Sequence, residues 1–165
     1  MSLREKIEAD FKKALKEKKE LTLSTLRMLR AALIDREKQK RFQLLSKESF
    51  SEEELANRVK LSDEEIIQVV SSQVKKRKES IEAYKKGGRE DLVEREEKEI
   101  EVLKNYLPEQ LSEEEIEKMV KEIINKIGAS DIKDMGKVMK EILEKIKGKA
   151  DGKTISEIVK RLLSK

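Results

Sequence analysis

Helical periodicity is the feature that most constrains this sequence. Apolar residues recur at the i, i+3, i+4, i+7 spacing of an amphipathic helix along most of the chain. The clearest case is 135–163, where two such runs flank the short segment 147–153. Ser-x-x-Glu capping boxes start three of the runs, at Ser2, Ser62 and Ser112. We therefore predict an all-α protein.

Composition supports helices and excludes several kinds of chemistry. Charged residues make up 45% of the chain and aromatic residues 3%, which favours helices with solvated faces over a β-sandwich. The absence of Cys and His excludes disulfides, thiol nucleophiles, Cys/His zinc sites and Ser–His or Cys–His dyads. The glutamates of 89–106 alternate with lysines as in surface ion pairing, so we expect no metal and no cofactor.

The expected cellular location rests on the absence of recognisable targeting and membrane segments. No apolar run reaches the ~20 residues of a membrane span, and the first residues lack an apolar signal core. We therefore expect a cytoplasmic protein with no membrane partner.

The first part of the chain predicts an N-terminal bundle of about four helices. They are expected at 2–18, 21–34, 62–86 and 89–106. Segment 21–34 is apolar nearly all round, which is typical of the buried helix in a bundle, and 35–41 extends it outward. Segment 42–60 is the least periodic, and we expect a loop or small helical insertion to which no chemistry is assigned.

Pro108 is the only proline and separates two periodic segments, so it predicts a domain boundary. An N-terminal helical domain would comprise 1–107. A C-terminal domain of three helices would comprise 108–165, a size at which independent folding is feasible.

Charge is distributed unevenly within the second domain. Segment 109–131 holds three lysines against seven acidic residues, whereas 132–165 holds nine lysines and Arg161 against five. The turn at 147–153 is rich in lysine and glycine, Gly148 can close the preceding helix, and Asp151 can cap the next. Because helix N-termini attract anions, we predict phosphate binding at this turn.

The predicted nucleic-acid-binding residues are lysines and glycines of 137–153. Lysines would contact phosphates, glycines would allow close backbone approach, and Gly136 would spare bulk at the start of its helix. The set is Lys137, Lys140, Lys147, Gly148, Lys149, Gly152 and Lys153. No aromatic residue interleaves with these lysines, so recognition of shape and backbone is expected rather than base stacking.

A second basic run lies inside the helix expected at 62–86. It consists of Lys75, Lys76, Arg77 and Lys78, which cannot all face one direction on a helix. A solvated face and a secondary phosphate-binding patch are about equally supported.

Several motifs resemble one known family. They are 87–92 (GGREDL), 103–111 (LKNYLPEQL), 134–139 (DMGKVM) and 147–153 (KGKADGK). They are similar to the YqeY family and, through it, to the tail domain of the GatB subunit of the tRNA-dependent amidotransferase. The resemblance implies two helical units, the second a three-helix bundle like the tail domain that helps to hold tRNA. The family is also labelled a carbon–nitrogen ligase with glutamine as amido-N-donor.

The expected function is a non-catalytic RNA-binding module, for tRNA or another structured RNA. The alternative is a protein-interaction helper that docks on a tRNA-handling enzyme, with its lysines merely solvated. No activated nucleophile and no nucleotide-binding loop are recognisable, so catalysis by the chain alone is not expected. The oligomeric state and the identity of the RNA or protein partner stay open.

Overall fold

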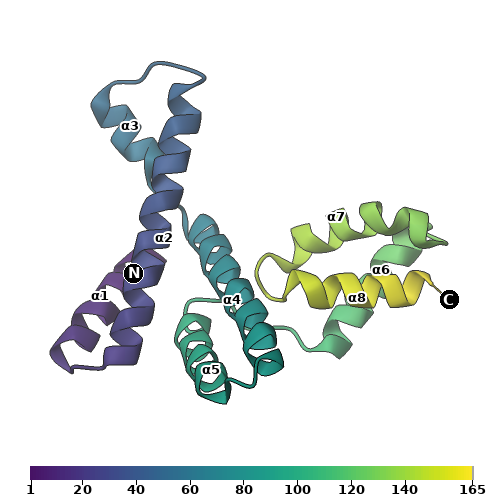
Figure 1. The fold of residues 1–165 in the computed structure, drawn as a ribbon. Coiled ribbons are helices and arrows are strands. Elements are labelled where there is room, and N and C mark those ends of the chain that lie inside the picture. The colour runs from purple at the N-terminus through teal and green to yellow at the C-terminus, as the bar shows by residue number, and fades with distance from the viewer. Residues whose placement is uncertain (165) are drawn as a thin grey trace. The chain divides into compact units, whose positions relative to one another are not determined.

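A computed structural model describes residues 1–164, and those residues form helices and no strand (Figure 1). The predicted all-α fold is confirmed. The helices are α1 (Leu3–Lys16), α2 (Glu20–Leu45), α3 (Glu52–Val59), α4 (Asp63–Lys86), α5 (Glu90–Lys104), α6 (Glu113–Ile127), the short 3-10 helix η1 (Ile132–Asp134), α7 (Met135–Ile146) and α8 (Gly152–Leu163). The chain divides into two compact units, Met1–Tyr106 and a second that begins at Leu107.

Ser-x-x-Glu capping boxes start α1, α3, α4 and α6. At α4, the Ser62 hydroxyl accepts from the Glu65 amide (3.2 Å) and the Glu65 carboxylate accepts from the Ser62 amide (2.8 Å). The same exchange starts α1, α3 and α6. The Lys40 ammonium and the Ser62 amide hold the pKa of Glu65 below its usual value. Each box satisfies two backbone groups that a helix start leaves unpaired.

The core of the first unit lies along one side of α2. Leu23, Leu26, Leu29 and Leu33 are buried there, and α2 contacts α1, α3, α4 and α5. The expectation that 21–34 is the buried helix of its bundle therefore holds for one side of α2 only, because residues such as Met28 and Ile34 on its other side are exposed. The helix also runs 26 residues to Leu45, so the expected outward extension is longer than predicted.

Tyr106 closes the first unit. Its hydroxyl donates to Asp10 Oδ2 (2.7 Å), and its side chain is buried. Burial and this hydrogen bond raise the pKa of Tyr106. Lys6 Nζ also donates to the Asn105 carbonyl (2.9 Å). These contacts tie the end of α5 to α1, and the first unit ends at this residue.

The second unit is a three-helix bundle of α6, α7 and α8. One cluster of buried side chains forms its core, and every member belongs to an apolar stripe of the sequence. The cluster comprises Ile116, Val120, Ile123, Val138, Ile142, Ile146, Ile155, Ile158, Val159 and Leu163. Gly128 ends α6 with a positive φ of 69°, a left-handed conformation that strains residues with a Cβ.

Candidate nucleic-acid interface

Buried isoleucines fix both ends of the lysine turn, which we define as residues 147–153. Ile146 ends α7 at 1% exposure, and Ile155 lies in the first turn of α8 at 0% exposure. Both side chains belong to the core of the three-helix bundle. The turn is therefore held at both ends by packing rather than suspended as a loose loop.

Two consecutive residues of the turn have positive φ values. Lys147 has φ 36° and Gly148 has φ 81°. The prediction that Gly148 is left-handed is confirmed, but the left-handed stretch starts one residue earlier than expected. Left-handed backbone is unfavourable for a lysine by about 1–2 kcal/mol. The rest of the bundle must therefore stabilise this conformation.

Asp151 caps α8, as predicted. Its side chain accepts from the Lys153 amide, so the first backbone donors of α8 already face a carboxylate. This placement weakens the expected attraction of the helix N-terminus for another anion. Lysine side chains, rather than backbone amides, must therefore supply most of any phosphate binding here.

The segment before α6 anchors the turn from outside. The Leu111 amide donates to the Lys149 carbonyl (2.8 Å), and Gln110 Nε2 donates to the Gly148 carbonyl (2.9 Å). These bonds join residues 38 apart in the sequence. Sequence reasoning missed this role of Gln110, since no local pattern marks such a long-range contact.

The same contact brings acidic residues close to the turn. Glu113, Glu114 and Glu115 form the first turn of α6, directly after Leu111. The acidic and basic halves of this unit, well separated in sequence, are therefore neighbours in the fold. Because opposite charges nearby lower the local potential, the turn is less positive than its own sequence suggests.

The five predicted lysines are all exposed, and they fall into two groups. Lys147, Lys149 and Lys153 share the end of the bundle where α7 meets α8. Lys137 and Lys140 lie in the first half of α7, three residues apart and thus on one face. Lys140 precedes Lys147 by two helical turns, about 10 Å along the axis. One extended phosphate chain could span both groups.

The glycines differ in what the fold requires of them. Gly148 needs its positive φ, whereas Gly152 has room for a side chain, because a Cβ there would meet no atom within 4 Å. The same holds at Gly136, so packing within the bundle does not require glycine there, and its role in sparing bulk at the start of α7 stays a prediction. Packing therefore does not explain the glycine at position 152, and close approach of a ligand from solvent stays its predicted role.

Arg77 is not part of the exposed surface of the second basic run. Lys75, Lys76 and Lys78 are exposed on α4, but Arg77 is 5% exposed and points into the first unit. Its Nε donates to Glu99 Oε2 (3.0 Å), and Arg95 Nε donates to Glu99 Oε1 (3.2 Å). The prediction that Arg77 belongs to a phosphate-binding patch is therefore wrong, because its charge is buried and paired.

Residues 1–164 contain neither a group of side chains suited to a metal ion nor a helix suited to a membrane. No group of three or more acidic side chains there is arranged to hold a metal ion. No helix in that range is long and apolar enough to cross a bilayer.

The fold and a family match together assign the protein to a family. The fold is an all-helical chain whose second unit is a three-helix bundle. The family of Yqey-like proteins matches residues 44–163. Because this match covers more than half of the chain, the protein belongs to the YqeY-like family.

Curated relatives come from fungi. "Altered inheritance of mitochondria protein 41, mitochondrial" of Pyrenophora tritici-repentis is 26% identical over 161 residues, which cover 96% of this chain and 79% of that protein. An uncharacterised protein of Schizosaccharomyces pombe is 36% identical over 90 residues, which cover 52% of this chain and 73% of that protein. The mitochondrial designation belongs to the relative, and a cytoplasmic location for this chain stays a prediction.

Proposed function

We propose that the second unit binds structured RNA, with tRNA as the first candidate, and performs no catalysis by itself. One observation carries the proposal. Exposed Lys147, Lys149 and Lys153 stand on a turn that core packing and two hydrogen bonds from 110–111 hold in place. Because the backbone of the turn is already ordered, binding a phosphate chain there costs little further ordering of the backbone.

The lack of aromatic side chains at the turn defines the kind of RNA. Both tyrosines and all three phenylalanines of the chain precede residue 107. Stacking on splayed bases is thus unavailable to the second unit, and recognition would rest on phosphates and helix shape. This preference favours folded RNA over single strands. Lys137 and Lys140 extend the contact along α7.

Salt dependence of tRNA binding tests the proposal. Each lysine–phosphate contact releases counterions, which contributes about 0.7–0.9 to the slope of log K against log salt. Replacing Lys147, Lys149 and Lys153 by Ala should reduce that slope by roughly 2–3. The matched control replaces exposed Lys12, Lys13 and Lys16 of α1, which removes the same charge.

The two outcomes separate the proposal from its alternative. RNA binding predicts a flattened slope for the turn variant and an unchanged slope for the α1 variant. If both variants bind tRNA as the parent does at every salt concentration, the turn is only a connector. A helper that docks on a tRNA-handling enzyme then becomes the better explanation.

A further inference from the structure

An exposed apolar face runs along α2. Among the described residues, four of the nine exposed large apolar side chains belong to this helix. They are Met28 (53% exposed), Ile34 (44%), Phe42 (76%) and Leu45 (48%). Scattered apolar residues on a surface need no explanation, but a concentration on one side of one helix marks an interaction surface.

The exposed face follows a heptad pattern. Positions 28, 31, 35, 38, 42 and 45 are separated by three and four residues in alternation, which is the spacing of the a and d positions of a coiled coil. All six side chains are exposed: Met28, Ala31, Asp35, Lys38, Phe42 and Leu45. We call these six residues the α2 seam. The buried leucines occupy the opposite side of the helix.

We propose that the α2 seam is a homodimer interface, in which α2 pairs antiparallel with α2 of a second copy of this chain. In an antiparallel pair, each a residue faces a d residue of the other helix. With the twofold axis between residues 36 and 37, Met28 faces Leu45 of the second copy and Ala31 faces Phe42. Asp35 faces Lys38, and symmetry repeats each pair.

The charges of the α2 seam favour an antiparallel second copy of this chain as its partner. Asp35 and Lys38 are 71% and 73% exposed and only 4.0 Å apart within one chain, so each can also pair with the opposite charge of a second copy. A parallel pair would place Asp35 against Asp35 and Lys38 against Lys38. A shift by one heptad would place these charges against apolar residues. A polar central layer of this kind sets the register of a coiled coil.

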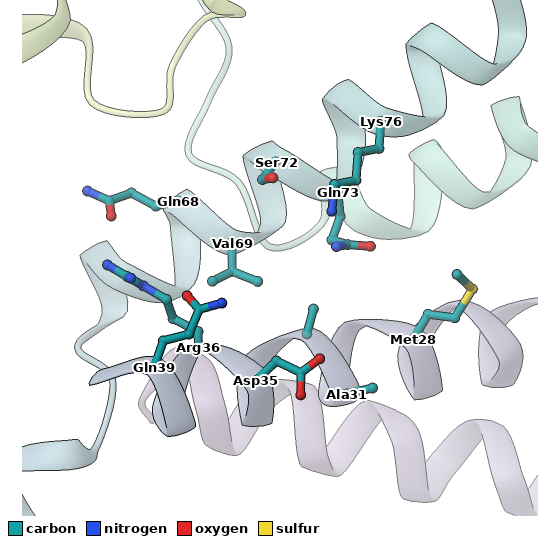
Figure 2. Close-up of a pocket in the computed structure, with 11 residues that line it drawn as sticks. Met28, Ala31, Asp35, Arg36, Gln39, Gln68, Val69, Ser72, Gln73 and Lys76 are labelled. Atoms are coloured by element: carbon teal, nitrogen blue, oxygen red, sulfur yellow. The ribbon is translucent and has the colours of Figure 1, made fainter. Parts of the chain in front are cut away.

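A neighbouring groove gives the second copy a place for its aromatic side chain. The groove is about 650 Å³ in volume and lies between α2 and α4 (Figure 2). Met28, Ala31 and Asp35 of the seam line it, together with Val69 and Ser72 of α4. Because Ala31 faces Phe42 of the second copy in the proposed register, that phenyl ring would enter the groove. Ala31 and Ala32 leave room for the ring beside α2, although longer side chains such as Arg36 also line the groove.

Sedimentation equilibrium of the full chain tests the dimer. The parent should show twice the chain mass of 19.2 kDa at micromolar concentration. Phe42→Glu should raise the dissociation constant at least about 30-fold, as expected for an aromatic side chain that becomes buried in an interface. Its circular dichroism should not change, because Phe42 is 76% exposed in the single chain. Leu15→Glu, at a 51% exposed position on α1, is the matched control and should leave the dimer intact.

Cysteine cross-linking tests the register, since the chain has no cysteine of its own. Mixing Ala31→Cys with Phe42→Cys should give a disulfide-linked dimer on oxidation. Either variant alone should not, because its two cysteines would be about 16 Å apart along the helix axis. A parent that stays monomeric even at about 1 mM, or a dimer unaffected by Phe42→Glu, overturns the proposal. Equal cross-linking of Ala31→Cys with itself overturns the antiparallel register.

Discussion

Removing the carboxylate of Glu99 should destabilise the first unit severely. Glu99 and Arg77 are each 5% exposed, and Glu99 accepts from Arg77 on one oxygen and from Arg95 on the other. In Glu99→Leu, the buried Arg77 guanidinium would lose its hydrogen-bonded carboxylate. It would keep the hydrogen bond to Gln73 Oε1 (3.2 Å) and a weaker electrostatic attraction to Glu96. A buried charge without its partner is strongly unfavourable.

The expected loss follows from comparable buried pairs. Breaking such a pair by removing one partner costs about 3–5 kcal/mol, against a total of about 5–15 kcal/mol for a folded domain. At a urea dependence of about 2 kcal/mol per molar, the midpoint of unfolding should fall by about 1.5–2.5 M. Arg95→Ala should cost no more than about 1 kcal/mol, since the Arg95 side chain is 60% exposed.

Tyrosine fluorescence in urea measures this change in the first unit alone. The chain has no Trp, and its two tyrosines, Tyr84 and Tyr106, both lie in the first unit. The double variant Arg77→Met, Glu99→Leu should recover most of the lost stability, because it leaves no unpaired charge. If Glu99→Leu lowers the urea midpoint by less than about 0.5 M, the reasoning is refuted, and Arg77 would again count among the accessible basic residues.

Three further predictions concern the glycines of the lysine turn, the second unit as a fragment, and catalysis. Gly148→Val should lower the free energy of unfolding of the second unit by at least about 1–2 kcal/mol and weaken RNA binding, because φ is 81° at Gly148, whereas Gly152→Ala should change stability by no more than about 0.5 kcal/mol. Chemical denaturation followed by circular dichroism compares the two variants, and equal losses of stability would contradict this prediction. A 108–165 fragment should unfold cooperatively on heating, and a transition without cooperativity would argue against an independent domain. The purified chain with glutamine, ATP and mischarged tRNA should form no amidated product; product that tracks the pure protein would show catalysis.

Local sequence patterns predicted the local structure well. The Ser-x-x-Glu boxes at Ser2, Ser51, Ser62 and Ser112 all start helices, because both partners of the capping exchange lie within four residues. Likewise, Gly128 ends α6 and Asp151 caps α8, because both roles depend on neighbouring residues in the sequence. The three apolar stripes after Pro108 form a single core, since three short amphipathic helices have few other ways to bury them.

The main errors concern contacts between distant residues. The sequence of 21–34 is apolar nearly all round, so it could not reveal that neighbouring helices cover only one side of α2. Arg77 reads as one of four adjacent cations, and its partner Glu99 is 22 residues away. The acidic start of α6 and the lysine turn look separate in sequence, and the bond from Leu111 to Lys149 joins them. Such pairings depend on the packing of whole helices.

Chemical protection of lysines by tRNA tests the central claim most directly. Exposed lysines of the full chain are acetylated with and without tRNA, and mass spectrometry reads the modification at each position. Our account predicts protection at Lys147, Lys149 and Lys153, weaker protection at Lys137 and Lys140, and none in α1. Protection absent from the turn, or concentrated instead on Lys75 and Lys76 of α4, would contradict the claim that the lysine turn binds RNA.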